Sequence, residues 1–469
     1  MQELDGARVL VAGLGVSGRA AAEVLRARGA RVTTYDEQVP DADLHVVDEV
    51  GPSDVVVASP GLRPMHPVLA RALAAGVPVW SEVELAWRLR ADRPSGPAPW
   101  LAVTGTNGKT TTVGMLTSIL ATAGERVAEV GNVGTPVVLA ATDPRVDVLA
   151  VELSSFQLHF TSSMSVQAGA VLNVAPDHLD WHGSIEAYAQ DKGRIFHQAQ
   201  VACIYNVADP RTQQLVRDAD VVDGALAVGF TRGVPGVGQL GLVEDVLVDR
   251  GFSAQRHTHA AELGTIADLG ALAGPDGSVP AHVVENALAA AGLALAHGVD
   301  PVHVREGLRA FAPGGHRIAT VAHADGVAYV DDSKATNAHA AAASLAAFAP
   351  GSVVWVAGGL AKGATFDELV AARVDRLRAV VLIGVDRAPL RDALARHAPQ
   401  VPVIEVDDGE TGQVMPHAVR QAHRLAVEPP AAGVTVLLAP ACASMDQFAS
   451  YADRGEQFAA AARALADGS

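Results

Sequence analysis

The clearest chemistry in this chain lies in one glycine-rich segment, residues 103–112, which reads VTGTNGKTTT. It follows an apolar run that begins at Trp100 and precedes a segment with helical character. A glycine-rich turn between a strand and a helix points backbone N–H groups at a bound anion. Lys109 can reach terminal phosphates, and the hydroxyl of Thr110 can ligate Mg²⁺. The pattern G-x-x-G-K-T, which lacks the first glycine of the general phosphate loop, therefore predicts a nucleoside triphosphate site.

A second glycine pattern, G-x-G-x-x-G at residues 13–18, follows an expected strand at residues 8–12. Asp36 ends the next expected strand, where an acidic residue can contact a ribose. The pattern is a weak signal, because it suits a UDP as well as NAD, and it also occurs in tight turns that bind nothing. The later turn that contains Ser59 and Gly61 would line the same crevice.

Further along the chain, carboxylates and imidazoles follow apolar runs. Glu152 ends the run 148–152, where an acidic residue of a phosphate-loop fold meets the metal. Asp177 and His178 follow in a short turn and, with Glu152, could form a site for a hard metal ion. The alternatives are a solvent-facing Glu152 and a structural His178. By spacing alone, Lys192 is an ordinary helical lysine.

Alternation of apolar runs and helical patterns predicts an α/β protein of three domains. Pro/Gly-rich breaks near residues 92–99 and 312–317 place the domains at 1–96, 97–313 and 314–469. We expect a Rossmann-like N-terminal domain, a P-loop-type central ATPase domain and a Rossmann-like C-terminal domain. Strands are expected at 8–12, 31–35, 54–58, 100–103, 148–152, 327–330, 353–357, 379–383, 401–406 and 434–439, and helices at 18–28, 113–122 and 281–296.

Composition excludes several classes of protein. The 469 residues carry 35 Lys and Arg against 52 Asp and Glu, a net charge of −17, which disfavours nucleic-acid and anionic-membrane partners. The two cysteines form no metal-binding or disulfide pattern. No signal peptide and no apolar run long enough for a membrane span is evident, so a cytoplasmic protein is expected.

Taken together, the motifs resemble those of the Mur ligase family, in the family's order and over essentially the whole chain. They are TGTNGKT, ELSSFQ at 152–157, PDHLD at 176–180, GHR at 315–317, DDSKATN at 331–337, GGLAKG at 358–363 and PACASMDQF at 440–448. The DSKATN and ACASMDQF blocks resemble the D-glutamate-adding branch, and the DNPR motif of other branches is absent from the sequence.

The resemblance implies a cytoplasmic ligase of peptidoglycan precursor synthesis, expected to be a monomer. ATP, UDP-N-acetylmuramoyl-L-alanine and D-glutamate would give the amide product, ADP and phosphate through an acyl phosphate. Two Mg²⁺ ions are implied, together with a carbamylated Lys192 whose added carboxylate faces one of them. Lys109, Glu152, His178, Lys192 and Lys334 would carry the catalysis.

The same resemblance assigns the remaining site residues by position. ATP would contact Gly105, Thr106, Asn107, Gly108, Lys109, Thr110, Thr111, Asn286, Arg317 and Asp331. The UDP-substrate would contact Gly15, Val16, Ser17, Asp36, Ser59, Gly61, Asn132 and His178. D-Glutamate would contact Lys334, Thr336, Lys362, Ser444 and Tyr451. The metal ligands would be Thr110, Glu152, His178 and Lys192.

Three positions depart from the family pattern. Val283 replaces an Asn on the adenine side, Gly315 replaces a Pro before His-Arg, and Tyr451 stands where a Phe is usual. Three other functions compete with this interpretation: an NAD(P)-dependent oxidoreductase, another amide ligase of the superfamily such as a folate polyglutamylating enzyme, and a non-catalytic ATP-binding partner. The second nucleotide loop argues against the oxidoreductase, and the branch motifs argue against another ligase.

Overall fold

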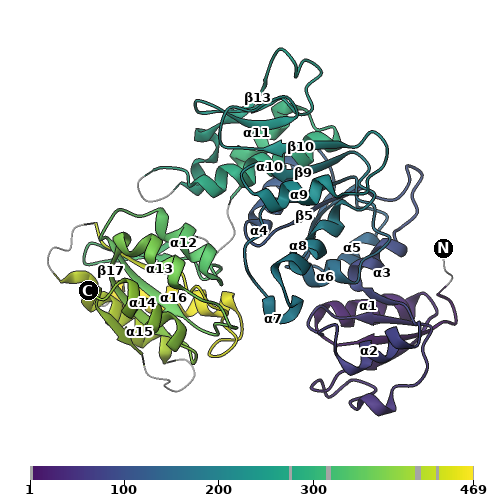
Figure 1. Cartoon of the computed structure of the whole chain (residues 1–469), viewed down its shortest axis with the longest axis horizontal. Coiled ribbons are helices and arrows are strands. Elements are labelled where there is room, and N and C mark those ends of the chain that lie inside the picture. The colour runs from purple at the N-terminus through teal and green to yellow at the C-terminus, as the bar shows by residue number, and fades with distance from the viewer. Residues whose placement is uncertain (1–3, 274–276, 313–317, 407–412, 429–432, 468–469) are drawn as a thin grey trace. The chain divides into compact units, whose positions relative to one another are not determined.

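The computed structural model describes residues 4–273, 277–312, 318–406, 413–428 and 433–467 (Figure 1). The chain divides into two compact units. The first comprises Met1–Ala271 with Ala281–Phe311, and the second comprises Leu272–Pro280 with Ala312–Ser469. The fold is α/β, as the sequence predicts, with three sheets among the described residues. The division into domains at residues 96 and 313 stays a prediction.

The N-terminal sheet of the first unit is parallel, in the order β2-β1-β3-β4. Its β3 is buried at every position, as expected for an inner parallel strand that is covered on both faces. The strands are β1 (Arg8–Ala12), β2 (Arg31–Tyr35), β3 (Val55–Ala58) and β4 (Val79–Ser81), and the α-helices are α1 (Val16–Ala27), α2 (Pro67–Ala74) and α3 (Glu82–Arg88).

The second sheet of this unit has the order β13-β12-β11-β10-β9-β8-β5-β7-β6. Strands β6 to β10 pair in parallel around β5, and β11, β12 and β13 pair antiparallel at one edge. The strands are β5 (Trp100–Thr104), β6 (Val127–Gly131), β7 (Val148–Glu152), β8 (Ala168–Val171), β9 (Ala202–Asn206), β10 (Leu226–Phe230), β11 (Gln239–Val243), β12 (Val246–Asp249) and β13 (Ala261–Thr265).

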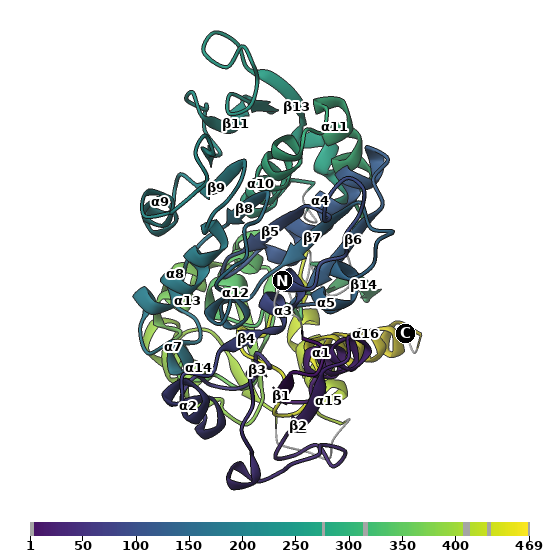
Figure 2. The ribbon, with the colours of Figure 1, turned by 90° about the vertical axis from the view of Figure 1, so that its right-hand side faces the viewer.

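Two long helices of this second sheet, α4 and α10, pack against each other, and Figure 2 shows them beside the sheet. The helices are α4 (Lys109–Thr122), α5 (Val137–Ala141), α6 (Ser155–His159), α7 (Leu179–His182), α8 (Ile185–Gly193), α9 (Pro210–Arg217), α10 (Ala281–His297) and α11 (Pro301–Ala310). β5 is an inner strand, between β8 and β7, and is buried throughout, so the start of the loop that follows it is held firmly by the sheet.

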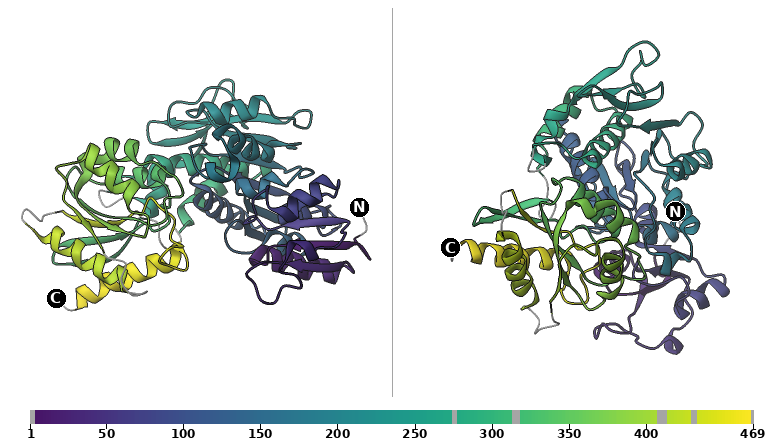
Figure 3. Two further views of the ribbon diagram at one scale, coloured as in Figure 1. Left: turned by 60° about the horizontal axis from the view of Figure 1, so that its bottom comes forward. Right: turned by 60° about the vertical axis from the view of Figure 1, so that its left-hand side comes forward.

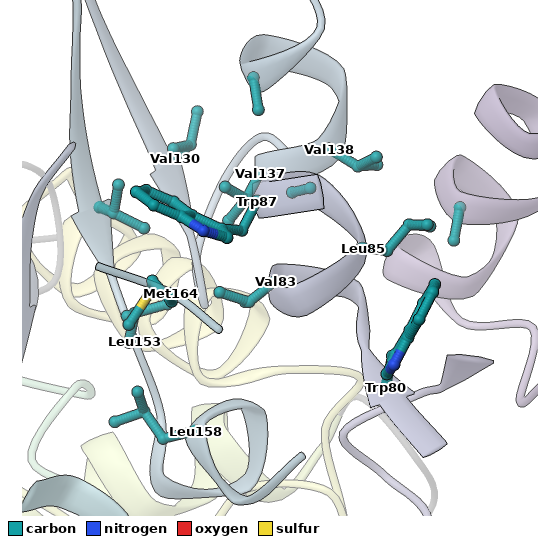
Figure 4. Close-up of a cluster of buried hydrophobic side chains, with 14 of the residues drawn as sticks. Trp80, Val83, Leu85, Trp87, Val130, Val137, Val138, Leu153, Leu158 and Met164 are labelled. Carbon is teal, nitrogen blue, oxygen red and sulfur yellow. The ribbon is translucent and has the colours of Figure 1, made fainter. Parts of the chain in front are cut away.

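A shared core joins α3 to the second sheet, so the two sheets of the first unit are packed as one body (Figure 4). Trp87 of α3 meets Trp100 of β5 edge to face, with ring centroids 5.1 Å apart. Such a pair contributes about 1 kcal/mol beyond the buried area. Glu82, at the start of α3, is buried with this core, and its carboxylate accepts the backbone N–H of Val138 in α5 at 2.6 Å.

The second unit holds the third sheet, in the order β14-β15-β19-β16-β17-β18. All pairs are parallel except β14 with β15, and α15 packs against α16 (Figure 3). The strands are β14 (Ala319–Ala324), β15 (Val327–Asp331), β16 (Val353–Gly358), β17 (Leu377–Ile383), β18 (Val403–Glu405) and β19 (Thr435–Leu438). The helices are α12 (Ala338–Ala346), α13 (Asp367–Arg373), α14 (Ala388–His397), α15 (Val414–Val427) and α16 (Tyr451–Asp467).

Each strand and helix expected from the sequence occurs, with boundary shifts. The helix after the glycine-rich loop begins at Lys109, four residues before the expected Val113, because Gly108 in a left-handed conformation starts it directly after the turn. Residues 232–249, which have no clear sequence pattern, contain the β11–β12 hairpin. None of the described helices is long and apolar enough to cross a membrane.

Candidate active site

The glycine-rich loop connects the inner strand β5 to α4. Gly105 and Gly108 have φ values of 156° and 86°, so the chain turns sharply where side chains would be strained. Helix α4 begins at Lys109 without a side-chain cap, and its first turn carries no acidic residue. The positive dipole end of this helix is therefore suited to an anion. The ammonium of Lys109 lies over the loop and donates to the carbonyl oxygens of Gly105 and Thr106 at 2.9 and 3.0 Å.

The loop is held in place by the segment that follows β8. The side-chain amide of Asn173 accepts the N–H of Asn107 at 2.9 Å and donates to its carbonyl at 3.1 Å. The Thr106 hydroxyl accepts the N–H of Ala175 at 3.0 Å and donates to the carbonyl of the same residue at 3.1 Å. These bonds connect the phosphate loop to the segment that leads to His178.

Asn286 of α10 lies against the same turn. A Cβ atom at Gly108 would be only 2.4 Å from Asn286 Oδ1, so the amide occupies the space that the glycine leaves. The family resemblance predicts that Asn286 contacts the nucleotide, and the fold brings this residue to the phosphate loop. Val283, one turn earlier, is buried at 4% exposure, so this replacement of an Asn is a core side chain.

Glu152 and Asn132 meet at the ends of neighbouring strands. Glu152 ends β7, is 3% exposed, and accepts a hydrogen bond from Asn132 Nδ2 at 3.0 Å. Asn132 follows β6, and its N–H donates to the backbone carbonyl of Glu152 at 2.9 Å. Gly131 allows this approach, because a Cβ there would lie 2.0 Å from that carbonyl oxygen. Glu152 is thus a buried, oriented carboxylate, and the solvent-facing alternative is wrong.

Lys192 is a buried lysine, and not the ordinary helical lysine that its spacing suggests. It lies in α8 with 1% exposure, its Nζ donates to the carbonyl of Gly105 at 2.8 Å, and it lies 4.4 Å from the centroid of the Tyr188 ring. Burial and the neighbouring charge of Lys109 hold the pKa of Lys192 well below its usual range. Carboxylates, Glu152 among them, oppose that shift. The site therefore favours a neutral, nucleophilic amine.

His178 starts α7 in a left-handed conformation, with φ 53°. Its N–H donates to the Asp177 carboxylate at 2.9 Å, and its ring packs on Phe156, with centroids 4.7 Å apart. Within the described residues, no group of three or more His, Cys, Asp and Glu side chains forms a ready metal site. A metal here would therefore need further oxygen ligands from Thr110, a phosphate or a modified Lys192.

Sequence reasoning missed a polar cluster beside these residues. One oxygen of the Asp191 carboxylate contacts Nδ1 of His159 at 2.8 Å and Nδ1 of His182 at 3.0 Å, and the other accepts from Arg194 at 3.1 Å. The Nε2 atom of His182 contacts the Ser155 hydroxyl at 3.0 Å. Burial opposes ionisation of Asp191, but hydrogen bonds from both histidines hold its pKa well below the usual range. Spacing along the chain gave no signal, because the partners lie on three different helices.

The N-terminal crevice forms where its glycines were expected. A Cβ at Gly13 would lie 2.6 Å from the Ser59 Cβ, so the two turns face each other, while Gly15, Val16 and Gly61 are exposed and Ser17 is partly exposed. The Asp36 carboxylate accepts backbone N–H groups from Leu14, Gln38 and Val39 at 2.7, 2.9 and 3.1 Å. Burial opposes its ionisation, but these bonds lower its pKa. Asp36 organises the crevice, and its contact with a ligand stays a prediction.

The crevice and α7 belong to the same body. Arg63, in the turn after β3, pairs with Asp180 of α7 at 2.8 Å. The pair is half-exposed and contributes about 1 kcal/mol or less. It nevertheless places the turn of Ser59 and Gly61 near the segment that bears His178.

The second unit gathers most of the residues that were assigned to D-glutamate. Lys334 follows β15, Ser444 follows β19 and Lys362 follows β16, and these strands are neighbours in the sheet. Lys334 Nζ donates to the Tyr451 hydroxyl at 3.1 Å and lies 4.2 Å from the centroid of its ring. The hydroxyl that distinguishes Tyr451 from the usual Phe thus has a partner.

The other assigned residues differ in exposure. Ser444 is 4% exposed, Lys362 is exposed with φ 52°, and Thr336 is half-buried. Asp331 ends β15 and is buried. Arg317 and Gly315 lie outside the described residues, so their expected roles stay predictions.

The phosphate loop follows an inner, buried strand of a mixed sheet, beside a buried carboxylate and two lysines, and this arrangement is typical of α/β proteins that bind a phosphoryl group. Residues 103–294 match the Mur ligase middle domain, and residues 316–442 match the Mur ligase glutamate ligase domain. A curated relative, UDP-N-acetylmuramoylalanine--D-glutamate ligase of Streptomyces coelicolor, is 56% identical, with 99% of each chain covered. The chain belongs to the Mur ligase family.

Solved structures agree on the fold. The crystal structure of UDP-N-acetylmuramate-alanine ligase MurC from Thermotoga maritima is 17% identical, with a TM-score of 0.58 over 98% of this chain and 99% of that one. MurF ligase from the same organism, in complex with ADP, is 16% identical, with a TM-score of 0.55 over 100% of this chain and 96% of that one.

Proposed function

We propose that this protein is an ATP-dependent amide ligase that adds D-glutamate to UDP-N-acetylmuramoyl-L-alanine in peptidoglycan precursor synthesis. The observation that carries the proposal is 56% identity over 99% of the chain to a ligase of that name. The phosphate loop, with Lys109 across it, supplies the site that an ATP-dependent reaction needs.

The chemistry follows from the weakness of a carboxylate as an acyl donor. The substrate carboxylate attacks the γ-phosphorus of ATP, ADP leaves, and an acyl phosphate forms. The D-glutamate amine then attacks the carbonyl carbon, phosphate leaves, and the nitrogen loses a proton. Lys109 and the N-terminal end of α4 would hold the phosphoryl group and neutralise its charge. Water must be excluded, because it would hydrolyse the acyl phosphate.

Thr110 and Glu152 would hold one Mg²⁺ ion, and His178 and a carbamylated Lys192 would hold a second. When bound, the ions neutralise phosphate charge and polarise the transferring group. The buried Glu152 carboxylate, oriented by Asn132, supports this role, since a buried carboxylate needs a cation or hydrogen-bond donors.

Carbamylation of Lys192 fits its surroundings. The neutral amine attacks the carbon of CO₂, a C–N bond forms as one C–O π bond opens, and the nitrogen loses a proton, so that the neutral amine becomes an anionic carbamate. A neutral amine is required, and burial together with Lys109 favours one. The product anion would lie next to the ammonium of Lys109, which removes the repulsion between the two cations.

The remaining assignments complete the proposal. Asn286 and Asp331 would contact the nucleotide, and Arg317 its phosphates. The crevice of residues 13–18, with Asp36 and Ser59, would bind the UDP moiety. Lys334, Thr336, Lys362, Ser444 and Tyr451 would surround D-glutamate. We also propose a three-domain, monomeric, cytoplasmic enzyme.

The decisive experiment measures phosphate release from ATP with UDP-N-acetylmuramoyl-L-alanine, in the presence and absence of D-glutamate, with Mg²⁺ and bicarbonate. Release that requires the nucleotide sugar and D-glutamate, and not L-glutamate, is the expected result. Release with a different amino acid would keep the mechanism and change the branch. Absence of phosphate release would overturn the proposal and would favour an oxidoreductase or a non-catalytic ATP-binding protein instead.

A further inference from the structure

Helix α16 carries a guanidinium that is entirely inside the second unit. Arg454 has 0% exposure, and among the described residues no carboxylate forms an ion pair with it, although Asp446 and Asp331 act on its charge at longer range. Burial lowers the pKa of Arg454 to about 10, so the side chain remains protonated at neutral pH. Burying an unpaired cation is costly, so its hydrogen bonds must offset a substantial penalty.

Those hydrogen bonds go to two different loops. Arg454 Nε donates to the Ser333 hydroxyl at 2.9 Å, and Nη2 donates to the Ser333 carbonyl at 2.9 Å. Nη1 donates to the carbonyl of Cys442 at 3.1 Å. The Ser333 hydroxyl in turn donates to the carbonyl of Tyr451 at 2.7 Å. The planar fork of an arginine can hold two backbones at a fixed separation, which a lysine cannot do.

The two loops are the ones that carry the amino-acid site. The loop at residues 332–337 follows β15 and bears Lys334 and Thr336, and the loop at residues 439–450 follows β19 and bears Ser444. The strands are parallel neighbours, and beyond their ends a backbone bond joins Ala441 N to Ala335 O at 2.9 Å. Arg454 adds a second link between the same two loops, next to Lys334.

We propose that Arg454 is a positioning residue for amino-acid binding, which fixes the distance of Lys334 from Ser444 by tying Ser333 to Cys442. The inference rests on the proposed function, because it takes those residues as the D-glutamate site. It predicts that loss of hydrogen bonds from Arg454 to these loops weakens the binding of D-glutamate selectively. ATP and UDP-substrate binding would stay the same, since their proposed loops lie mainly in the first unit.

The test compares steady-state kinetics of Arg454→Lys with the wild type and with Arg463→Lys, an exposed position on the same helix. Loss of a charge-assisted hydrogen bond should raise KM for D-glutamate by about tenfold or more. The KM values for ATP and UDP-N-acetylmuramoyl-L-alanine should change by less than about twofold. Arg463→Lys should match the wild type in all three.

A milder variant, Ser333→Ala, keeps the test open if Arg454→Lys does not fold. It removes the hydroxyl that accepts from Nε and should raise KM for D-glutamate by a smaller factor in the same selective way. An unchanged KM for D-glutamate in a folded variant, or a parallel rise in all three KM values, would overturn the inference. If the wild type consumes no D-glutamate, the proposed function itself fails, so the two failures are distinguishable.

Discussion

Lys109 and Lys192 donate hydrogen bonds to the same carbonyl oxygen, that of Gly105, at 2.9 and 2.8 Å. Two cations that share one acceptor repel each other, and only Lys192 is fully buried. Burial and the charge of Lys109 therefore disfavour the protonated form of Lys192, whereas an anion at that position would attract the ammonium of Lys109. This relationship is the physical basis for the proposed carbamate.

Replacing Lys192 tests that basis. Lys192→Ala should lower ligase activity by about 100-fold or more, because a carboxylate facing the transferring phosphoryl group is lost. Added acetate should restore part of the activity by occupying the space that the side chain leaves. Lys192→Arg keeps a cation and cannot form a carbamate, so it should be inactive and insensitive to acetate. Full activity of Lys192→Arg, measured as phosphate release, would contradict the carbamate.

Replacing Gly131 by alanine tests whether the orientation of Glu152 matters for activity. In Gly131→Ala the new methyl group would meet the carbonyl oxygen of Glu152 at 2.0 Å, so the strand end must shift. We expect at least about a tenfold loss of kcat, since small displacements of catalytic groups are costly. Gly134→Ala is the matched control, because Gly134 also has a positive φ, of 81°, but open space around its Cβ position.

The control should lose only about 1 to 2 kcal/mol of stability from left-handed strain, with kcat nearly unchanged. Thermal unfolding and steady-state kinetics of both variants separate the two effects. Equal losses of kcat in the two alanine variants would mean that backbone strain, and not the position of Glu152, limits activity.

Asp191→Asn tests the polar cluster. The amide can present only one acceptor oxygen, so it cannot satisfy both the histidine pair and Arg194. We expect a loss of about 1 to 3 kcal/mol of stability. Asp180→Asn breaks an exposed pair on α7 and should cost less than about 1 kcal/mol. Differential scanning calorimetry of the two variants makes the comparison, and similar melting temperatures would argue that the cluster is energetically minor.

Glu82 predicts a pH dependence of stability. Burial raises its pKa from about 4.5 to about 7, while a backbone hydrogen bond from Val138 opposes the shift. The folded state holds the proton of Glu82 more tightly than the unfolded state does. The contribution of this proton to the free energy of unfolding is therefore fully present below about pH 4.5. This contribution, about 3 kcal/mol in all, is then lost as the pH rises through about 7.

Glu82→Gln removes this titration. Its melting temperature, relative to that of the wild type, should rise between pH 5 and pH 8, whereas Glu23→Gln on the exposed face of α1 should follow the wild type. Melting curves at several pH values measure both. A constant difference between Glu82→Gln and the wild type across that range would show that Glu82 does not carry its proton into the folded state.

The local chemistry was readable from the sequence alone. The phosphate loop, the family and the α/β class follow from short motifs and apolar periodicity, because strand–turn–helix geometry depends on neighbouring residues. The same local reasoning assigns Lys109 to the phosphates, whereas Asn286 was assigned to the nucleotide by the family resemblance. It found the strand that ends at Glu152, and it could not say that this carboxylate is buried against Asn132.

Only the tertiary structure decided the surroundings of the buried charges. Lys192 looks like a surface lysine until α8 places it against Gly105, 87 residues earlier in the chain. Asp191 gains His159 and His182 from separate helices, and Arg454 reaches Ser333 across 121 residues. Desolvation, pKa and hydrogen-bond partners depend on which distant segments pack together, and no spacing along the chain encodes them.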